Sequence, residues 1–375
     1  MSLARSLALR LPAIRRLVEG RDQLIVELQR AREALGTSET QASALLSAQQ
    51  ALVEGRDQLI VELQRAREAL GTSEAQASAL LSAQQTLEED TAEMRLARLE
   101  NRLFITEYSY FPSARPIKAS AGGRQLEAMF RRSQASIEET VRGIARHTDR
   151  LTRVPHAADG SLRPFWQNDW FPPFDGAALY GLIAENKPRR YIEVGSGIST
   201  RFARQAITDL ELATKIVSID PHPHNAVQGL CDETIVSRME DLPASFWAGL
   251  SAEDMLFIDN SHRSFPGSDV TIFFTEILPS LPAGVIYGVH DICLPSDYPA
   301  EWNYRFYNEQ YLLMAYLLGG ANEDQILLPL AWTCEQIGLH GLLSALWSSK
   351  DLFAGIRVHG SAFWARRGKR SHLHT

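Results

Sequence analysis

Two acids and two histidines follow apolar runs that are typical of buried strands. Asp259 ends one run and precedes His262 by three residues, and His290 and Asp291 follow the next run. Neighbouring strands of an open α/β sheet deliver their carboxyl ends to one crevice, so we expect these side chains to meet there. Carboxylates with an imidazole can hold a divalent cation such as Mg²⁺ or Mn²⁺. We therefore predict Asp259, His290 and Asp291 as metal ligands.

A histidine whose pKa lies near neutrality can accept a proton from a reacting hydroxyl. We predict His262 as this general base. The alternative is a histidine that is only hydrogen-bonded within its own loop, at 261–268. The pair His290-Asp291 is also able to act without a metal.

A glycine turn lies earlier in the chain, between two further apolar runs. Residues 191–194 are expected to form a short buried strand, Gly195 to Thr200 the turn, and 201–207 the start of a helix. Glycines let a backbone approach a ligand, and a helix N-terminus offers free N–H groups. Asp220 ends the next strand, 23 residues after Gly197, where an acid can hold both ribose hydroxyls. This pattern predicts a nucleoside site.

The turn lacks the third glycine of the dinucleotide fingerprint, because Gly197 is followed by Ile198, Ser199 and Thr200. That difference disfavours NAD, whose pyrophosphate needs a close backbone approach. Glu193, at the tip of the preceding strand, suits a ligand with an ammonium group. The alternative for Glu193 is an acid that is satisfied by backbone N–H groups.

The run Glu193-Val194-Gly195-Ser196-Gly197, with Asp220 after the next strand, resembles motifs I and II of class I S-adenosylmethionine-dependent methyltransferases. The resemblance spans about 166–367. It implies an α/β fold: a Rossmann-like, seven-stranded sheet with helices on both faces, closed by an antiparallel strand at 362–366. It also implies that the glycine turn cradles the methionine part of S-adenosylmethionine. Asp220 would bind the ribose, and an acidic pair after a strand at 234–236 would lie beside adenine. The implied cofactor-binding residues are Glu193, Gly195, Ser196, Gly197, Ser199, Asp220, Glu240 and Asp241.

The later acids and histidines are similar to those of metal-dependent sugar O-methyltransferases of the macrolide-modifying kind. That family has an acid after strand four, a histidine three residues later, and an acidic pair after strand five. Asp259 and His262 match this spacing, and Asp291 matches one member of the pair. His290 departs from it, since an acid is usual there, and a histidine ligand moves the preference from Mg²⁺ toward Mn²⁺, Fe²⁺ or Zn²⁺. The implied reaction is methyl transfer to a hydroxyl of a sugar, polysaccharide precursor or related small molecule.

Two other functions compete with this hypothesis. An NAD-dependent oxidoreductase or epimerase is disfavoured by the missing glycine and by the absence of a Tyr-x-x-x-Lys pair. A non-catalytic coiled-coil scaffold with a degenerate methyltransferase domain is disfavoured by the intact acids Glu193, Asp220 and Asp259.

The N-terminal part contains a tandem repeat. Residues 17–51 recur as 52–86 with two differences, Ala75 for Thr40 and Thr86 for Ala51. The period of 35 residues is five whole heptads, which keeps a coiled-coil seam in register. We predict a coiled-coil arm that makes the chain a homo-oligomer. A helical hairpin, with a helix end at Gly36 and a cap at Ser38, is the competing geometry, and a neutral spacer is the competing role.

Composition restricts the remaining possibilities. The formal net charge of -7 disfavours nucleic acid as a partner. Three scattered cysteines without a CxxC pair disfavour a thiolate zinc site and fit a reducing cytosol. Arginines are interspersed through residues 1–16, unlike in a signal peptide, so we expect a cytoplasmic enzyme and leave open a peripheral contact with an anionic membrane. The expected segments are a basic amphipathic 1–16, the arm 17–103, a helical linker 104–164, the catalytic domain 165–368 and a basic tail 369–375.

Two aromatic segments belong to the predicted catalytic domain. The run at 165–175 favours core packing with some pocket lining, and Asp175 is expected to cap a helix over 176–186. The run at 293–311 follows a strand whose tip should touch substrate, and its rings and polar side chains suit a sugar or another polyol. The alternative for the second run is a helix packed on the sheet.

Overall fold

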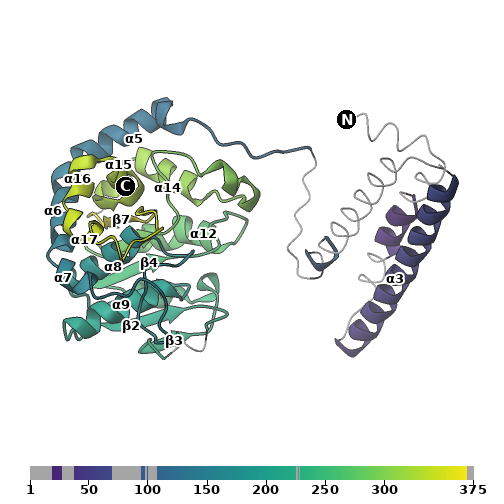
Figure 1. The fold of residues 1–375 in the computed structure, drawn as a ribbon. Helices are drawn as coiled ribbons and strands as arrows, with labels where there is room; N and C mark the ends of the chain where they lie inside the picture. Colours follow the sequence, from purple (N-terminus) through teal and green to yellow (C-terminus); the bar gives the residue numbers. More distant parts are fainter. Residues whose placement is uncertain are drawn as a thin grey trace, which may run out of the picture. The chain divides into compact units, whose positions relative to one another are not determined.

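The computed structural model describes residues 19–27, 38–69, 94–97, 99, 108–224, 227 and 229–369. The chain divides into two compact units, Met1–Ser109 and Tyr110–Thr375, and each is described by itself (Figure 1). The boundary falls inside the segment 104–164 that we predicted as a linker. The basic segment 1–16 and most of the tail lie outside the described residues.

The first unit contains a helix over 19–27 and the longer α3 (Ser38–Ala69). A Cβ added to Gly55 would lie 3.2 Å from Cδ1 of Leu24. In one straight helix these two residues would stand roughly 46 Å apart, at 1.5 Å per residue. The two helices therefore contact each other at Leu24 and Gly55, and Ser38 is the first residue of α3. This contact agrees with the helical-hairpin alternative, whose predicted helix end at Gly36 lies outside the described residues, and a coiled coil between chains stays a prediction.

The second unit begins with helices that pack on its core. They are η1 (Ile117–Ala119), α5 (Ala121–Arg132), α6 (Gln134–Ala145) and α7 (Thr148–Leu151). Ser120 caps α5 by accepting a hydrogen bond from the backbone N–H of Gly123. The apolar positions of α5 and α6, such as Phe130 and Val141, are buried in the same core as the sheet. The predicted helical linker 104–164 thus contains α5, α6 and α7, and apolar side chains of α5 and α6 pack into the core of the second unit.

A seven-stranded mixed sheet forms the centre of the second unit, with the order β3-β2-β1-β4-β5-β7-β6. The first five strands are parallel, and β7 runs antiparallel to both of its neighbours. This agrees with the predicted Rossmann-like sheet and its antiparallel closing strand. The strands are β1 (Arg190–Val194), β2 (Lys215–Ile219), β3 (Glu233–Ile235), β4 (Asp254–Ile258), β5 (Ile286–Val289), β6 (Gln325–Pro329) and β7 (Phe363–Arg366).

Helices cover the sheet, so that every residue of β4 is buried, as expected for a central parallel strand. The helices are α8 (Pro173–Asn186), α9 (Ile198–Asp209), η2 (Met239–Asp241), α11 (Ala244–Ala248), α12 (Asp269–Ile272), η3 (Phe273–Ile277), α13 (Leu278–Ser280), η4 (Ala300–Arg305), α14 (Glu309–Leu318), η5 (Ala321–Glu323), α15 (Leu330–Glu335), α16 (Ile337–Gly341) and α17 (Ser344–Trp347). Among the described helices, none combines the length and the apolar character that crossing a membrane requires.

The aromatic run at 165–175 mostly joins the core, where Trp166, Phe171 and Phe174 are buried. The predicted role of Asp175 as a helix cap is wrong. Helix α8 begins earlier, at Pro173. The buried Asp175 carboxylate instead accepts hydrogen bonds from the backbone N–H groups of Ser361 and Ala362, next to β7.

Candidate active site

The glycine turn connects β1 to α9 and is fixed to both neighbouring strands. Gly195 has a φ of +83°, and a Cβ there would collide with the carbonyl oxygen of Asp259, so only glycine fits. Its N–H donates to the carbonyl of Ile219 over 2.9 Å. At Gly197 an added Cβ would meet nothing within 4 Å. The turn therefore touches β4 on one side and exposes backbone at Gly197 on the other, as a ligand cradle requires.

Glu193 lies beneath this turn and is fully buried. Its carboxylate accepts hydrogen bonds from the hydroxyls of Tyr191 and Ser199, each at 3.1 Å, and from that of Thr200. Burial raises the pKa of Glu193 to about 8, although the three hydroxyls oppose this shift. We predicted that Glu193 faces the ligand. The structure instead places it under the turn, where hydroxyl groups rather than backbone N–H groups occupy its oxygens and hold the start of α9.

Asp220 follows β2 and is brought to the turn. The hydroxyl of Ser196 donates to its Oδ2 over 2.5 Å, and the N–H of His222 donates to its Oδ1 over 2.8 Å. Asp220 is partly exposed, unlike Glu193. The structure thus unites the predicted residues Ser196 and Asp220 at the carboxyl edge of the sheet.

The predicted adenine-side pair lies in η2. Arg238 forms a two-pronged hydrogen bond with Asp241, at 2.8 and 2.9 Å, and its Nη1 is 3.7 Å from Oε1 of Glu240. In the described part of the chain, no hydrogen bond joins this pair to Asp220 or to the glycine turn. Contact of Glu240 and Asp241 with a ligand stays a prediction.

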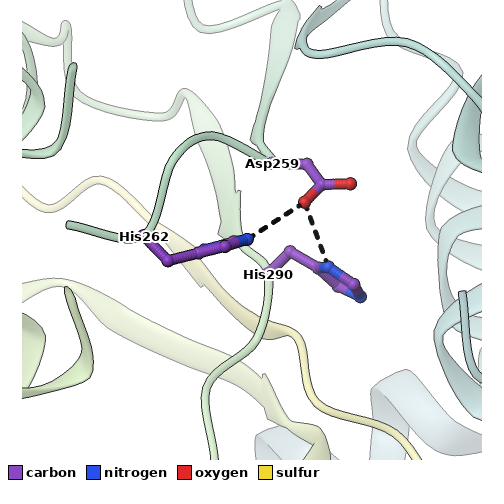
Figure 2. Close-up of side chains that lie close together, drawn as sticks. All are labelled: Asp259, His262 and His290. Carbon is purple, nitrogen blue, oxygen red and sulfur yellow. Dashed lines mark hydrogen bonds and ion pairs between the residues drawn. The ribbon is translucent and has the colours of Figure 1, made fainter. Parts of the chain in front are cut away.

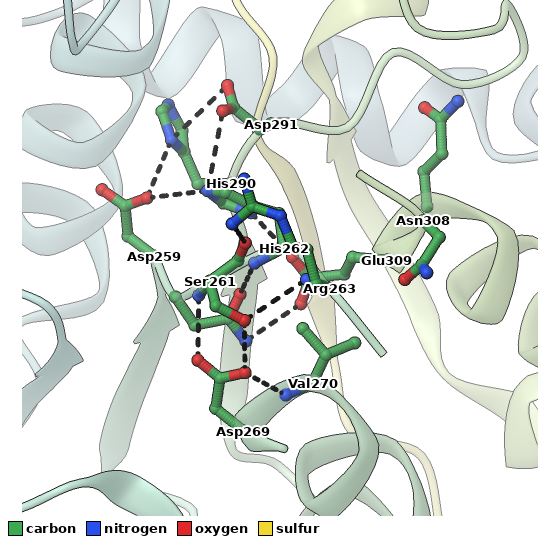
Figure 3. A network of polar contacts seen from close by, with 12 residues as sticks. Asp259, Ser261, His262, Arg263, Asp269, Val270, His290, Asp291, Asn308 and Glu309 are labelled. Atoms are coloured by element: carbon green, nitrogen blue, oxygen red, sulfur yellow. Dashed lines mark hydrogen bonds and ion pairs between the residues drawn. The ribbon is translucent and has the colours of Figure 1, made fainter. Parts of the chain in front are cut away.

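The four residues predicted after β4 and β5 meet in one place; Figure 2 shows Asp259, His262 and His290, and Figure 3 also shows Asp291. Nδ1 of His290 lies 3.2 Å from Oδ1 of Asp259, and Nε2 of His262 lies 3.5 Å from the same oxygen. Asp291 is close to both rings, with Oδ2 3.6 Å from Nε2 of His262 and Oδ1 3.8 Å from Nδ1 of His290. These contacts confirm that the two strand ends share a crevice.

The grouping of metal-competent atoms differs from the predicted one. One ligand atom each from Asp259, His262 and His290 lies within 4.8 Å of the others, whereas Asp291 is outside this group. Two imidazoles with one carboxylate suit Mn²⁺, Fe²⁺ or Zn²⁺ better than Mg²⁺. His262, predicted as a base, is thus also placed as a metal ligand would be.

Electrostatics favour charged forms in this cluster. Burial opposes the protonated form of His262, but hydrogen bonds to Asp259 and Glu309 and the charges of Glu309 and Asp291 raise its pKa well above the usual value. Burial likewise opposes protonation of His290, but the carboxylates around it raise its pKa to about 9. Burial would raise the pKa of Asp259, yet the two histidines lower it below its usual range.

Glu309, at the start of α14, was missed by the sequence analysis. Its side chain is fully buried, and its Oε2 lies 2.9 Å from Nδ1 of His262 (Figure 3). Its Oε1 accepts from Nδ2 of Asn260 over 3.3 Å, and its backbone N–H donates to the carbonyl of His262. A carboxylate on one ring nitrogen fixes the orientation of a histidine and directs the other nitrogen to its target. Here that target is the space beside Asp259 and Asp291.

Two members of the cluster have left-handed backbone conformations, with φ of +59° at His262 and +51° at Asp291. Non-glycine residues at positive φ are uncommon and cluster at functional sites. The His262 loop is held in this form by Ser261, whose hydroxyl and N–H both donate to Asp269 of α12 over 2.6 and 2.8 Å.

Comparison with known proteins addresses the same part of the chain. Residues 192–292 match the family model described as "Methyltransferase domain". The matched range starts within β1 and runs past Asp291, so it includes the glycine turn, Asp220 and the histidine cluster. The chain contains a methyltransferase domain. This confirms the predicted class of enzyme.

Several solved structures are similar to this chain. S-adenosylhomocysteine-bound PaMTH1 from Podospora anserina is 14% identical, with a TM-score of 0.34, and the match covers 60% of this chain and 88% of that one. The O-methyltransferase TomG from Streptomyces achromogenes, with S-adenosylmethionine, is 16% identical with a TM-score of 0.26, covering 52% and 81%. MycE, with Mg, S-adenosylhomocysteine and mycinamycin VI, is 14% identical with a TM-score of 0.30, covering 52% and 49%. No curated protein matches the sequence.

Proposed function

We propose that the methyltransferase domain moves a methyl group from S-adenosylmethionine to a hydroxyl oxygen of a sugar, polysaccharide precursor or related small molecule. The observation that carries this proposal is the contact between the glycine turn and the cluster formed by Asp259, His262 and His290. Gly195 of the turn lies directly against the backbone of Asp259, and Asp259 lies against both histidines. A nucleoside on the turn and an acceptor beside His262 would therefore be neighbours.

The residues around the turn fit the methyl donor. Open backbone at Gly197 and a partly exposed carboxylate at Asp220 suit a nucleoside without a pyrophosphate. The sulfonium supplies a methyl group that is already activated. The protein then contributes mainly by orienting the acceptor oxygen, which can lower the barrier by about 7–11 kcal/mol.

His262 is positioned to take the hydroxyl proton. Its Nδ1 is occupied by Glu309, so Nε2 is the atom that faces the crevice. A neutral ring is needed for this role, whereas the carboxylates around His262 favour the charged ring. A positive charge nearby lowers the pKa of a histidine, so a bound sulfonium would favour the neutral base. Such a base is worth roughly 10²–10⁴-fold in rate.

The same cluster fits a divalent cation that accepts both nitrogen and oxygen ligands, such as Mn²⁺, Fe²⁺ or Zn²⁺. Asp259 and His290 would hold it, with Asp291 beside them, and it would act as a Lewis acid on the acceptor hydroxyl. His262 competes as a ligand for the same ion because its Nε2 belongs to the metal-competent group. The two roles of His262, general base and metal ligand, are separable by measuring Mn²⁺ binding in His262→Ala.

A thermal-shift comparison tests the cofactor. We expect S-adenosylhomocysteine to raise the melting temperature of the full chain and NAD to leave it unchanged. Ligand at a hundred times its dissociation constant stabilises by about 2.7 kcal/mol. The shift should disappear in Asp220→Ala and persist in the matched variant Asp351→Ala, which alters an exposed acid outside the site. A shift with NAD instead would support the oxidoreductase alternative.

The first unit is proposed to join copies of the chain. Helix α3 exposes large apolar side chains that its hairpin partner leaves uncovered, namely Leu45, Leu46, Val53 and Val61. Apolar positions on a heptad repeat favour a second copy as the partner.

A further inference from the structure

A layer of aromatic rings extends from His262. The ring of Tyr307 lies 4.7 Å from that of His262. Tyr298 and Trp302 each lie 5.9 Å from Tyr307, and all three belong to the segment after β5. Tyr304, in the same segment, is 73% exposed. These rings form an aromatic cluster beside the predicted base.

Two arginines lie on these rings. The guanidinium of Arg263 is 5.1 Å from the centre of Tyr307, and that of Arg305 is 4.4 Å from Trp302 and 5.5 Å from Tyr307. Their hydrogen bonds go to neutral oxygens: Arg263 donates to the carbonyls of Arg305 and Ser261, and Arg305 donates to the hydroxyl of Tyr304. Within the described ranges, neither guanidinium has a carboxylate at ion-pair distance.

Arg201 has a similar arrangement on Phe165, whereas several other arginines of the domain have ion pairs. Arg238 is paired with Asp241, and Arg204 is paired with Asp232. The three acids of the cluster, Asp259, Asp291 and Glu309, each lie within ion-pair distance of His262. Two positive charges therefore remain unneutralised beside the reaction centre.

A guanidinium held on a ring face is oriented, and its N–H groups that make no internal hydrogen bond can bind a carboxylate or phosphate. We propose that the acceptor is an anionic sugar, whose carboxylate or phosphate pairs with Arg263 or Arg305 while its hydroxyl faces His262. This inference rests on the proposed methyl transfer and names the acceptor class for that site.

A matched pair of probes tests the proposal: 4-nitrophenyl β-D-glucuronide and 4-nitrophenyl β-D-glucopyranoside, which differ in one carboxylate. Both are titrated calorimetrically into the full chain saturated with S-adenosylhomocysteine. We expect the glucuronide to bind at least about tenfold more tightly, because a charge-assisted bidentate pair exceeds a neutral hydrogen bond by this order. The preference should narrow as salt rises.

The double variant Arg263→Gln/Arg305→Gln should bring the ratio of the two affinities to about one. The matched control Arg132→Gln, which alters an exposed arginine on α5, should leave the ratio unchanged. Equal affinities in the unmodified chain, a ratio retained in the double variant, or no saturable binding of either probe would each overturn the anionic acceptor. S-adenosylhomocysteine is titrated into the chain before the probes are added. Its failure to bind would instead contradict the proposed methyl transfer itself.

Discussion

At the scale of the single residue, carboxylates contact both ring nitrogens of His262. Glu309 occupies its Nδ1, and Asp259 and Asp291 face its Nε2. The backbone around it is equally constrained, because its carbonyl accepts from the N–H groups of Asn308 and Glu309. A ring fixed in this way loses little further freedom when it meets an acceptor, which is what orientation in catalysis requires.

Substituting His262 separates its two candidate roles. We expect His262→Ala to lower turnover by about 10²–10⁴-fold while S-adenosylhomocysteine affinity is unchanged. As a base, His262 is dispensable for the metal, so Mn²⁺ binding, measured by electron paramagnetic resonance, should persist in this variant and be lost in Asp259→Asn. Loss of Mn²⁺ in both variants would identify His262 as a ligand instead. The control His359→Ala, at an exposed site, should leave all three quantities unaltered.

Glu309 is a positioning residue, since it acts through His262. Glu309→Leu should lower kcat by about ten- to a hundredfold, the usual effect of removing an orienting partner, with little change in KM. Glu309→Gln should recover part of this loss, because an amide oxygen can still accept from Nδ1–H. Equal kcat values in the two variants would show that the orientation of the ring does not depend on this hydrogen bond.

At the scale of elements, the glycine turn between β1 and α9 has two glycines with different duties. Gly195 is needed for the fold, since it combines positive φ with contact to Asp259. Gly197 has an extended φ of 178° and open space around it, so its lack of a side chain serves a ligand. Gly197→Ala should therefore keep the melting temperature and weaken S-adenosylhomocysteine binding, whereas Gly195→Ala should lower the melting temperature. An unchanged affinity in Gly197→Ala would show that the ligand does not approach this backbone.

Residues at the strand ends were sufficient to predict the shared crevice, and the resemblance to class I methyltransferases implied the seven-stranded sheet. Parallel strands β4 and β5 had to bring Asp259, His290 and Asp291 together, whatever the details of the loops. Helix ends were less predictable: α8 starts before Asp175, because Pro173 suits the first turn and Asp175 is bound by the segment before β7.

Contacts between distant segments could not be read from the sequence. Glu309 is 47 residues from His262 and has no spacing signature that links them. Glu193 was correctly placed at the strand tip, but its contacts with Ser199 and Thr200 depend on how the turn folds back over it. The wrong role of Asp175 and the unforeseen contacts of Glu193 both concern which neighbour an acid meets.

At the scale of the whole molecule, the exposed apolar side chains of α3 are the proposed contact between copies of the chain. We expect light scattering to show that the full chain is an oligomer, and Leu46→Glu to shift it toward single chains with unchanged turnover per chain. Leu46 is 64% exposed, so the substitution should not unfold the hairpin. Ser47→Glu, at a neighbouring exposed position, is the matched control. A single-chain mass for the unmodified protein would contradict the proposed joining of copies.

The close approach of Gly195 to the Asp259 carbonyl couples the nucleoside half of the crevice to the acceptor half. With no side chain between them, a shift of the turn is transmitted directly to the backbone that carries Asp259. Occupancy of one half of the crevice should then alter affinity in the other half by the same factor in both directions. A chain already loaded with nucleoside would present a different acceptor half than an empty chain, so the affinity for the acceptor should depend on whether the donor is bound.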